Sequence, residues 1–349
     1  MGTPKKILVM RFSSMGDVAL VAPVLHAVAQ ACQEVEVTML TRPRFAAFFY
    51  GLQRVRLMAA DLEGKHKRLW GIWRLFRQLT KEKYDVVIDL HDHLRTKIIR
   101  FLFALTGTPV VVFDKGRAEK GELVRKNFKI RKKLPHTVDR YAEAFNKAGL
   151  SFAMITFPGF EISSQSEQRV LQWLAAKALV KGELWVGLAP FAVHPTKIWP
   201  LERYVPLIKM MQEGRQVKFF LFGGGAGEVA FFSGLVALFP HHTVLVAGQM
   251  SLQEELALIR KMDKMLTMDS ANMHLAALLG VPVVSIWGGT HTDAGFGPYG
   301  NQDKTVLEVT TTVLPCRPCS VYGKPTCHRG DFACLTAIEV QDVAKKLMQ

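Results

Sequence analysis

The chain has 349 residues, of which 49% are hydrophobic and 21% are charged, and its formal net charge is +15. This composition excludes a disordered protein, and the length exceeds what one hydrophobic core usually serves, so we expect two domains. No stretch offers the roughly 20 continuous apolar residues of a membrane-spanning helix, and no signal-peptide cleavage site follows the apolar N-terminus. The sequence therefore predicts a cytoplasmic protein.

The positive charge is concentrated in the first half of the chain. Residues 1–160 hold 28 Lys and Arg against 14 Asp and Glu, or +14, whereas residues 161–349 hold 17 against 16, or +1. We interpret this as one domain facing an anionic partner; a solvated basic surface is the alternative. No helix-turn-helix, RNP or zinc-finger pattern accompanies the charge, so we expect no nucleic-acid partner.

Apolar, β-branched runs recur along both halves and predict buried parallel strands, because they are continuous rather than alternating. In chain order they are Lys6–Phe12, Val35–Thr41, Tyr84–Leu90, Pro109–Asp114, Leu184–Pro190, Val217–Gly223, Thr243–Gly248, Lys264–Asp269 and Val281–Trp287. Helical stretches between them include Val18–Ala31, Glu167–Ala178, Glu202–Glu213, Glu228–Leu238, Leu252–Lys261 and Met273–Leu279. Strand followed by helix, repeated in both halves, predicts two doubly wound α/β domains.

Composition also places the domain boundary. Residues 151–166 hold a Pro-Gly pair and a Ser/Gln cluster, and they coincide with the change in charge. We therefore assign residues 1–160 to an N-terminal Rossmann-like domain and residues 161–335 to a C-terminal one. Residues 336–349 are predicted to form a short amphipathic helix that packs back on the N-terminal domain.

Two segments concentrate the basic residues of the first half. Residues 65–77 combine Leu69, Trp70 and Trp73 with Lys and Arg at helical spacing. This pattern is typical either of a helix resting on an anionic membrane, here the inner face of the cytoplasmic membrane, or of a core-packed helix with a wet basic face. Residues 115–133 hold nine Lys or Arg against two Glu and predict either a phosphate-gathering surface or a mobile charged loop.

The first strand leads into the loop Ser13-Ser14-Met15-Gly16-Asp17. Ligands of open α/β sheets bind beyond the carboxyl ends of the strands, where this loop lies. Its single glycine excludes the dinucleotide-binding fingerprint. Asp17 is either a helix cap or a catalytic group, and the loop by itself leaves both interpretations open.

Further strand-to-helix loops in the second half carry polar residues. In residues 188–200, Lys197 can place its charge on a diphosphate, with a solvated surface lysine as the alternative. In residues 268–280, small and polar residues precede the free N–H groups of a helix, which favours an anion site; a plain capped helix is the alternative. The glycine-rich turn at residues 223–227 matches neither a P-loop nor a Rossmann fingerprint.

Taken together, these loops resemble glycosyltransferase family 9, the ADP-heptose:lipopolysaccharide heptosyltransferases. The N-terminal signature of the family resembles Ile7–Val18, and further anchors are Tyr84–Leu90, Lys197-x-Trp199-Pro200, Gln249–Leu252, and Asp269-Ser270-x-x-x-His274-Leu275-Ala276-Ala277-x-x-Gly280. The resemblance covers nearly the whole chain.

The resemblance implies a GT-B fold of two Rossmann-like domains with a cleft between them, and an inverting transfer of a heptose or similar sugar. It also implies an ADP-activated donor on the C-terminal domain and an anionic lipopolysaccharide core acceptor on the N-terminal one. Asp17 would be the general base. Donor contacts are expected from Lys197, Glu228, Met250, Asp269, Ser270, Ala271 and His274, and acceptor contacts from Ser13, Ser14, Gly16, Arg95 and Lys97.

Two departures from the family pattern lie in the donor loops. Residues 191–195 read Phe-Ala-Val-His-Pro where the family often has Ser, Thr or Gly, and Ala271 replaces a common glycine. A nucleotide-sugar-binding protein without transferase activity is therefore the alternative function. These loops carry no Asp-x-Asp motif and the family does not depend on one, so we expect no cofactor and no catalytic metal.

Four cysteines cluster near the C-terminus, with two, seven and six residues between them: Cys316, Cys319, Cys327 and Cys334. They are candidates for a zinc site, for a cluster of reduced thiols, or for a disulfide. The expected cytoplasmic location argues against the disulfide.

Overall fold

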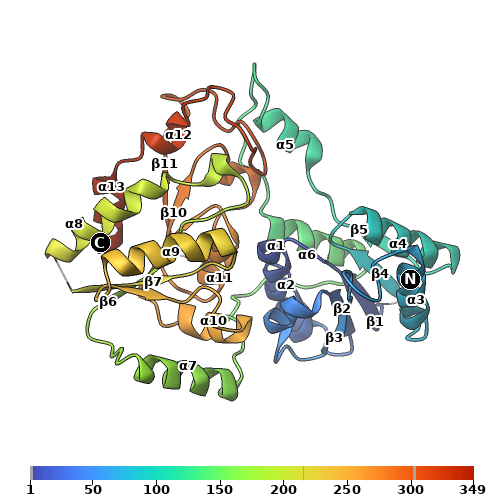
Figure 1. Ribbon diagram of the computed structural model, residues 1–349. Coiled ribbons are helices and arrows are strands. Elements are labelled where there is room, and N and C mark those ends of the chain that lie inside the picture. Colours follow the sequence, from blue (N-terminus) through green and yellow to red (C-terminus); the bar gives the residue numbers. More distant parts are fainter. Residues whose placement is uncertain (1–2, 215, 302–303) are drawn as a thin grey trace. The chain divides into compact units, whose positions relative to one another are not determined.

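The computed structural model describes residues 3–214, 216–301 and 304–349. The chain divides into two compact units: unit 1 contains Met1–Gly116 and Pro135–Glu161, and unit 2 contains Arg117–Leu134 and Ile162–Gln349. Each unit is built on a sheet of parallel strands with helices packed on it (Figure 1). The predicted class, two doubly wound α/β domains, is confirmed.

Unit 1 has its strands in the order β3-β2-β1-β4-β5. They are β1 (Lys6–Met10), β2 (Glu36–Thr41), β3 (Val55–Ala59), β4 (Val86–Asp89) and β5 (Val110–Val112). The helices are α1 (Met15–Ala19), α2 (Ala22–Ala31), the 3-10 helix η1 (Pro43–Phe49), α3 (Leu69–Thr80), α4 (Leu94–Leu105) and α6 (Thr137–Lys147). The predicted helix Val18–Ala31 is thus two helices, and Pro23 lies in the first turn of the second, where proline is tolerated.

Unit 2 has its strands in the order β11-β10-β9-β6-β7-β8. They are β6 (Leu184–Ala189), β7 (Val217–Leu221), β8 (Thr243–Leu245), β9 (Lys264–Met268), β10 (Val283–Trp287) and β11 (Lys304–Glu308). The α-helices are α5 (Arg117–Leu123), α7 (Ser164–Ala176), α8 (Tyr204–Gly214), α9 (Ala226–Leu238), α10 (Leu252–Ile259), α11 (Ala271–Leu278), α12 (Ala333–Thr336) and α13 (Val340–Met348). Short 3-10 helices are η2 (Pro195–Lys197), η3 (Leu201–Arg203) and η4 (Thr292–Ala294).

Two strands, β3 and β11, were not among the predicted ones. Each pairs on one side only, at the edge of its sheet. An edge strand is buried less than a central one, so it needs no continuous apolar run, and β3 carries Arg56 between apolar residues. Hydrophobic runs predict every central strand, and also the edge strands β5 and β8.

The basic segment 117–134 lies in unit 2 although it is flanked on both sides by unit 1. The backbone N–H of Leu134 donates to the carbonyl of Asp293 at 2.9 Å, and Lys129 Nζ donates to the carbonyls of Pro315 and Pro318 at 3.1 and 2.9 Å. The predicted boundary at residue 160 therefore places this segment in the wrong domain. Unit 1 holds 20 Lys and Arg against 13 Asp and Glu and unit 2 holds 25 against 17, so their charges are +7 and +8. The expected confinement of the basic charge to one domain is wrong.

The C-terminal helix α13 is amphipathic, as predicted, but it belongs to unit 2. It packs against α8 and β10, and Val343, Ala344 and Leu347 are buried in the hydrophobic core of that unit. The expectation that it packs back on the N-terminal domain is wrong, because its apolar face is already covered within its own unit.

The helix predicted within residues 65–77 is α3. It buries Ile72, Leu75 and Phe76 in the core of unit 1 and leaves Trp70 exposed. Within the three described ranges, no helix combines the length and the apolar character that crossing a bilayer requires.

Candidate functional site

The predicted site loops follow neighbouring strands at the point in each sheet where the strand order reverses. In unit 1 the chain moves from β1 to β2 and β3 on one side, and then to β4 and β5 on the other. In unit 2, β6 and β9 flank the same kind of switch point. Ligands of open α/β sheets bind beyond the carboxyl ends of such strands. The loops after β1 and β4 are therefore the candidate site of unit 1, and those after β6 and β9 are the candidate site of unit 2.

The Asp17 carboxylate lies in the first turn of α1. Its Oδ2 accepts hydrogen bonds from Ser14 Oγ at 2.9 Å and from the Ser14 backbone N–H at 3.4 Å, in a capping box. Gly16 is buried in the same turn, whereas Ser14 is exposed. The helix-cap interpretation of Asp17 is thus correct, and a carboxylate that caps a helix can also accept a substrate proton.

A buried arginine accompanies Asp17. Arg11 Nη2 lies 2.5 Å from Asp17 Oδ2, and Arg11 Nη1 donates to the carbonyl of Leu90 after β4. Burial opposes the charge of Arg11, but Asp17 and Tyr141 outweigh it and raise the pKa of the guanidinium above its ordinary value. Arg11 therefore links the loops after β1 and β4 and remains a cation that favours an ionised Asp17.

The loop after β4 is held by Asp89, which is fully buried. Its Oδ1 accepts the backbone N–H groups of His91 and Asp92, both at 2.9 Å, and its Oδ2 accepts Arg100 Nη1 at 3.1 Å. His91 Nε2 lies 3.2 Å from the hydroxyl of Ser13. The structure thus brings Ser13 together with a histidine that the sequence analysis missed.

The two basic residues predicted to contact the acceptor lie on α4. Lys97 Nζ lies 3.7 Å from Asp92 Oδ1, and Arg95, the second residue of the helix, is half-buried. Lys115 Nζ also approaches Asp92, at 3.7 Å from Oδ2. A group of cations therefore surrounds Asp92 beside the loop that carries His91.

Replacing His91 with glutamine should make the protein more resistant to acid. Burial, with Arg11 nearby, lowers the pKa of His91 from 6.5 to about 3. The unfolded chain therefore takes up a proton near pH 6.5 while the folded protein does not, so the free energy of unfolding falls as the pH decreases from 6.5 to 3. Urea unfolding at several pH values measures this fall, which should be smaller in His91→Gln than in the wild type. The control is His241→Gln, an exposed histidine of unit 2, which should behave as the wild type does.

In unit 2, Lys197 and Asp269 meet at the switch point. Lys197 Nζ lies 2.9 Å from Asp269 Oδ2, which also accepts the Thr290 hydroxyl at 2.8 Å. Lys197 closes the 3-10 helix after β6, Asp269 follows β9 directly, and both side chains are largely buried. The solvated-lysine alternative is therefore wrong: the ammonium group is fixed at the carboxyl edge of the sheet.

The other predicted donor residues of this loop begin α11. Ser270 is its N-cap residue and Ala271 its first residue, and the Ser270 hydroxyl lies 3.3 Å from Thr267 Oγ1 rather than capping the helix. Because the Ser270 side chain does not accept from the first N–H groups of α11, these groups can donate to another acceptor. His274, one turn further on, is buried.

Glu228 and Met250 lie in the loops that follow the two adjacent strands, β7 and β8. Glu228 Oε2 accepts the backbone N–H of Gly224 at 2.9 Å, and a Cβ on Gly223 would lie only 2.5 Å from the same oxygen. Met250 is half-buried directly before α10, whose N-cap is Ser251. The strands β8-β7-β6-β9 are neighbours, so the predicted donor residues all lie at one sheet edge.

In the loop after β6, Phe191, one of the residues that differ from the usual family pattern, packs against α9. The ring of Phe191 contacts the rings of Phe231 and Phe232 on α9 edge-on, at centroid distances of 5.6 and 5.5 Å. The loop is therefore anchored to α9 through an aromatic cluster, and Lys197 follows it with a defined position.

All five cysteines are free, and no group of three or more His, Cys, Asp or Glu in the described ranges is arranged to hold a metal ion. Burial raises the pKa of the Cys319 and Cys334 thiols, that of Cys334 to about 12. This arrangement agrees with the reduced cluster among the three alternatives and not with the zinc site or the disulfide.

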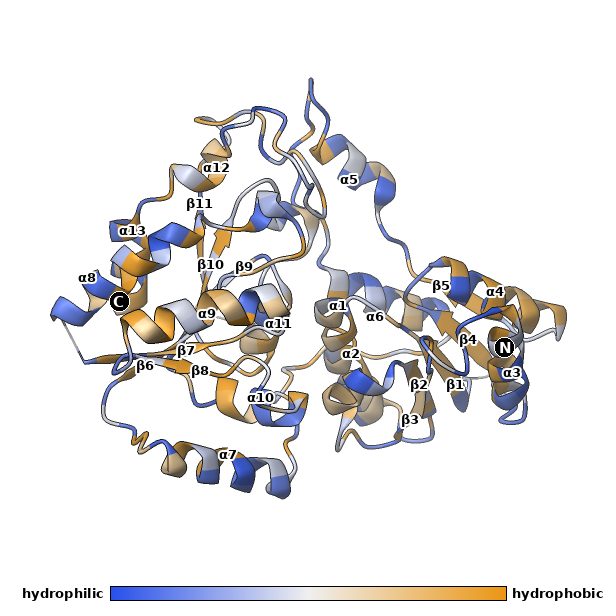
Figure 2. Cartoon of the chain, in the orientation of Figure 1, coloured by the Kyte–Doolittle hydropathy of each residue, from blue (hydrophilic) through white to orange (hydrophobic). Residues whose placement is uncertain are grey.

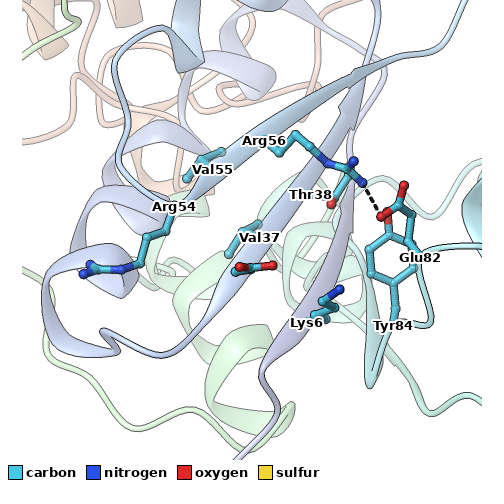
Figure 3. A pocket seen from close by; sticks show the side chains of 9 residues that line it. Lys6, Val37, Thr38, Arg54, Val55, Arg56, Glu82 and Tyr84 are labelled. Carbon is cyan, nitrogen blue, oxygen red and sulfur yellow. Dashed lines mark ion pairs between the residues drawn. The ribbon is translucent and has the colours of Figure 1, made fainter.

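A cavity of about 540 Å³ opens elsewhere in unit 1, at the amino ends of β1, β2 and β3 (Figure 3). Its lining is Lys6, Glu36, Val37, Thr38, Arg54, Val55, Arg56, Glu82 and Tyr84, and an ion pair of 2.9 Å joins Arg56 to Glu82. The candidate loops follow the carboxyl ends of these strands. The cavity therefore lies at the opposite edge of the sheet and is not part of the candidate site.

Sequence reasoning missed four polar side chains of the site: Arg11, Asp89, His91 and Thr290. The run His91-Asp92-His93 directly after a buried strand is the same signal that identified the other loops, and it could have revealed His91. Arg11 was hidden because it follows an apolar strand and precedes Phe12, so its burial beside Asp17 is visible only in the fold.

Comparison with known proteins gives this geometry its context. Residues 72–325 match the sequence model of glycosyltransferase family 9 (heptosyltransferase). The chain belongs to glycosyltransferase family 9. This family 9 chain is therefore a transferase enzyme, and the alternative of a binding protein without activity is not supported.

One curated relative and two solved structures align with nearly all of this chain at low identity. Lipopolysaccharide heptosyltransferase 1 of Pseudomonas aeruginosa is 29% identical, over 98% of this chain and 97% of the relative. Among solved structures, a family 9 glycosyltransferase from Veillonella parvula has a TM-score of 0.77 at 20% identity, covering 99% and 97% of the two chains. E. coli heptosyltransferase WaaC with ADP-2-deoxy-2-fluoro heptose has a TM-score of 0.65 at 19% identity, covering 98% and 99%. The GT-B fold expected of this family 9 chain is confirmed.

Proposed function

We propose that this protein is an inverting glycosyltransferase that moves a heptose from ADP-heptose to an anionic lipopolysaccharide core, at the inner face of the cytoplasmic membrane. The observation that carries the proposal is the gathering of Lys197, Glu228, Met250 and Asp269 at one edge of the unit 2 sheet in a family 9 chain. The heptose donor analogue in the WaaC structure and the name of the Pseudomonas aeruginosa relative support this choice of donor and acceptor.

In the proposed mechanism, Asp17 accepts the proton of an acceptor hydroxyl as its oxygen attacks the anomeric carbon. The bond from that carbon to the diphosphate oxygen breaks on the opposite face, and its electron pair leaves with ADP, so the configuration inverts. Lys197 and the first N–H groups of α11 stabilise the negative charge of the departing diphosphate. Asp269 holds the ammonium of Lys197 in place for this role.

The rest of the donor fits the neighbouring loops of unit 2. The Glu228 carboxylate, fixed by the N–H of Gly224, is suited to accept hydrogen bonds from the ribose hydroxyls. Met250 offers a polarisable side chain to the adenine ring. In unit 1, the proposed acceptor contacts are Ser13, Ser14 and Gly16, beside Asp17, and Arg95 and Lys97, in the first turn of α4 after the loop that follows β4.

The test is transfer of heptose from ADP-heptose to a heptose-free core acceptor, followed by mass spectrometry, with GDP- and UDP-sugars as competing donors in calorimetry. Lys197→Met should bind ADP roughly 10- to 100-fold more weakly, since it loses a charge-assisted contact to phosphate. The matched control is Lys209→Met, an exposed lysine of α8. Tighter binding of GDP or UDP than of ADP, or binding without turnover on the core acceptor, would contradict the proposal.

A further inference from the structure

The helices α3 and α4 lie side by side on one face of the unit 1 sheet (Figure 1). They connect β3 to β4 and β4 to β5, two right-handed crossovers that run in the same direction across the sheet. Their inner faces share one core, in which Phe76 of α3 meets Phe103 of α4 edge-on at 5.1 Å. The opposite faces of both helices therefore form one outer surface.

This outer surface is apolar to an unusual degree. On α4, residues 96, 99 and 103 are buried, and the stripe opposite them consists of Leu94, Phe101 and Leu105. Leu94 is 68% exposed, Phe101 61% and Leu105 68%. Figure 2 shows the resulting hydrophobic colouring along α4. Such a stripe at helical spacing is ordinarily the face that a helix buries, so α4 carries two apolar faces and only one of them is covered.

The neighbouring helix adds aromatic side chains to the same surface. Trp70 is 82% exposed, and Leu69 and Trp73 flank it at the start of α3 with 70% and 43% exposed. Tryptophan is the side chain that prefers the boundary between water and lipid, because its ring is apolar and its N–H is polar.

The charges around this surface have a single sign. Residues 65–81 contain six Lys or Arg and no Asp or Glu, and residues 94–105 contain three and none. On α3, Arg74 and Arg77 follow Trp70 by four and seven residues, so they lie on the same side of the helix as the exposed ring. A partner for this surface is therefore both apolar and anionic, as the interface of an acidic phospholipid bilayer is.

We infer that the outer surface of α3 and α4 docks the protein on an anionic lipid bilayer, with Trp70, Phe101 and Leu105 entering the interface and Arg74 and Arg77 binding the headgroups. This inference deepens the proposed function, on which it rests, because it names the surface that reaches a membrane-borne acceptor. Two short exposed stripes and basic residues produce reversible binding that depends on lipid charge, and not insertion.

The experiment is co-sedimentation of the full-length protein with vesicles of phosphatidylcholine containing 30% phosphatidylglycerol, about 100 nm across, compared with pure phosphatidylcholine. The wild type should bind the anionic vesicles and lose binding in high salt. The double variant Phe101→Ser, Leu105→Ser should bind about tenfold or more weakly, and Arg74→Glu, Arg77→Glu should lose the preference for anionic lipid. The matched control is Leu171→Ser, Leu238→Ser, two leucines exposed on α7 and α9 of unit 2, which should bind as the wild type does.

Equal vesicle binding by the wild type and the double variant would overturn the inference. A second result would also overturn it: the wild type is a dimer in light scattering and does not bind vesicles, whereas the double variant is a monomer. The surface would then be the interface with a second copy of the chain. Turnover on a water-soluble, lipid-free core acceptor separates this inference from the proposed function. The double variant should keep wild-type turnover there, whereas failure of the wild type on that acceptor would count against the function and not against the surface.

Discussion

Asp17→Asn is expected to lower kcat by roughly 10²- to 10⁴-fold, the usual contribution of a general base. Asparagine has nearly the same shape and still offers an oxygen to the Ser14 hydroxyl and N–H, so α1 keeps its cap. It cannot accept the proton of the acceptor hydroxyl. The binding of ADP, which we assign to unit 2, should remain as in the wild type. Steady-state transfer kinetics, with calorimetry of ADP binding, measure both quantities.

Unit 1 itself supplies a matched control for this experiment. Asp139 is the third residue of α6 and accepts the N–H of His136 at 3.2 Å, in the same capping geometry as Asp17 and Ser14. Asp139→Asn should leave kcat unchanged. If both variants lost the same amount of activity, Asp17 would be a helix cap and nothing more, and the base would have to be sought among the other groups near Ser13.

Arg317→Met is expected to lower the free energy of unfolding of unit 2 by roughly 3–5 kcal/mol, the cost of breaking a buried ion pair. Arg317 is fully buried, and its guanidinium donates to the carbonyls of Gly288, Trp287 and Thr290 and to the Glu308 carboxylate, at 2.6, 3.1, 3.1 and 2.9 Å. Methionine fills part of the space but leaves every one of these acceptors without its donor.

The loss should reach the donor site as well, since the Thr290 hydroxyl binds Asp269, the partner of Lys197. Urea unfolding and calorimetric ADP titration of Arg317→Met measure the two effects. Arg329→Met is the control, because Arg329 pairs with Asp331 at the surface of the same C-terminal region and its loss should change little. A variant as stable as the wild type would show that the carbonyls find other donors.

The elements that the sequence predicted well are those whose signal is local. Strands buried on both faces, such as β1 and β9, are recognised in the sequence as apolar runs. The loop after each strand then contains the candidate site residues, such as Asp17 and Asp269. The edge strands β3 and β11 lack that signal because charged residues interrupt them, whereas the edge strands β5 and β8 carry none and were predicted. The assignment of Asp17 to catalysis rather than to capping came from the resemblance, since both roles use the same carboxylate in the same turn.

The segment 117–134 could not be placed from the sequence for a different reason. Its partners in unit 2 include backbone carbonyls: those of Pro315 and Pro318 accept from Lys129, and that of Thr311 accepts from Arg131. A carbonyl is present at every residue, so nothing in the sequence of the loop at 311–318 marks it as the binding place of a lysine. The charge of the segment was visible, but the acceptor of that charge was not.

This placement has a consequence for how the chain is made. Lys129 and Pro318 are 189 positions apart. At about 5–20 residues per second, the ribosome needs roughly 10–40 s to travel from one to the other. During this interval the segment leaves the ribosome before its binding place has been made, and the polypeptide on either side of it can form unit 1. The nascent chain thus carries a basic segment that can bind unit 2 only after residue 318 has been made. A fragment that starts at residue 162 would lack this segment.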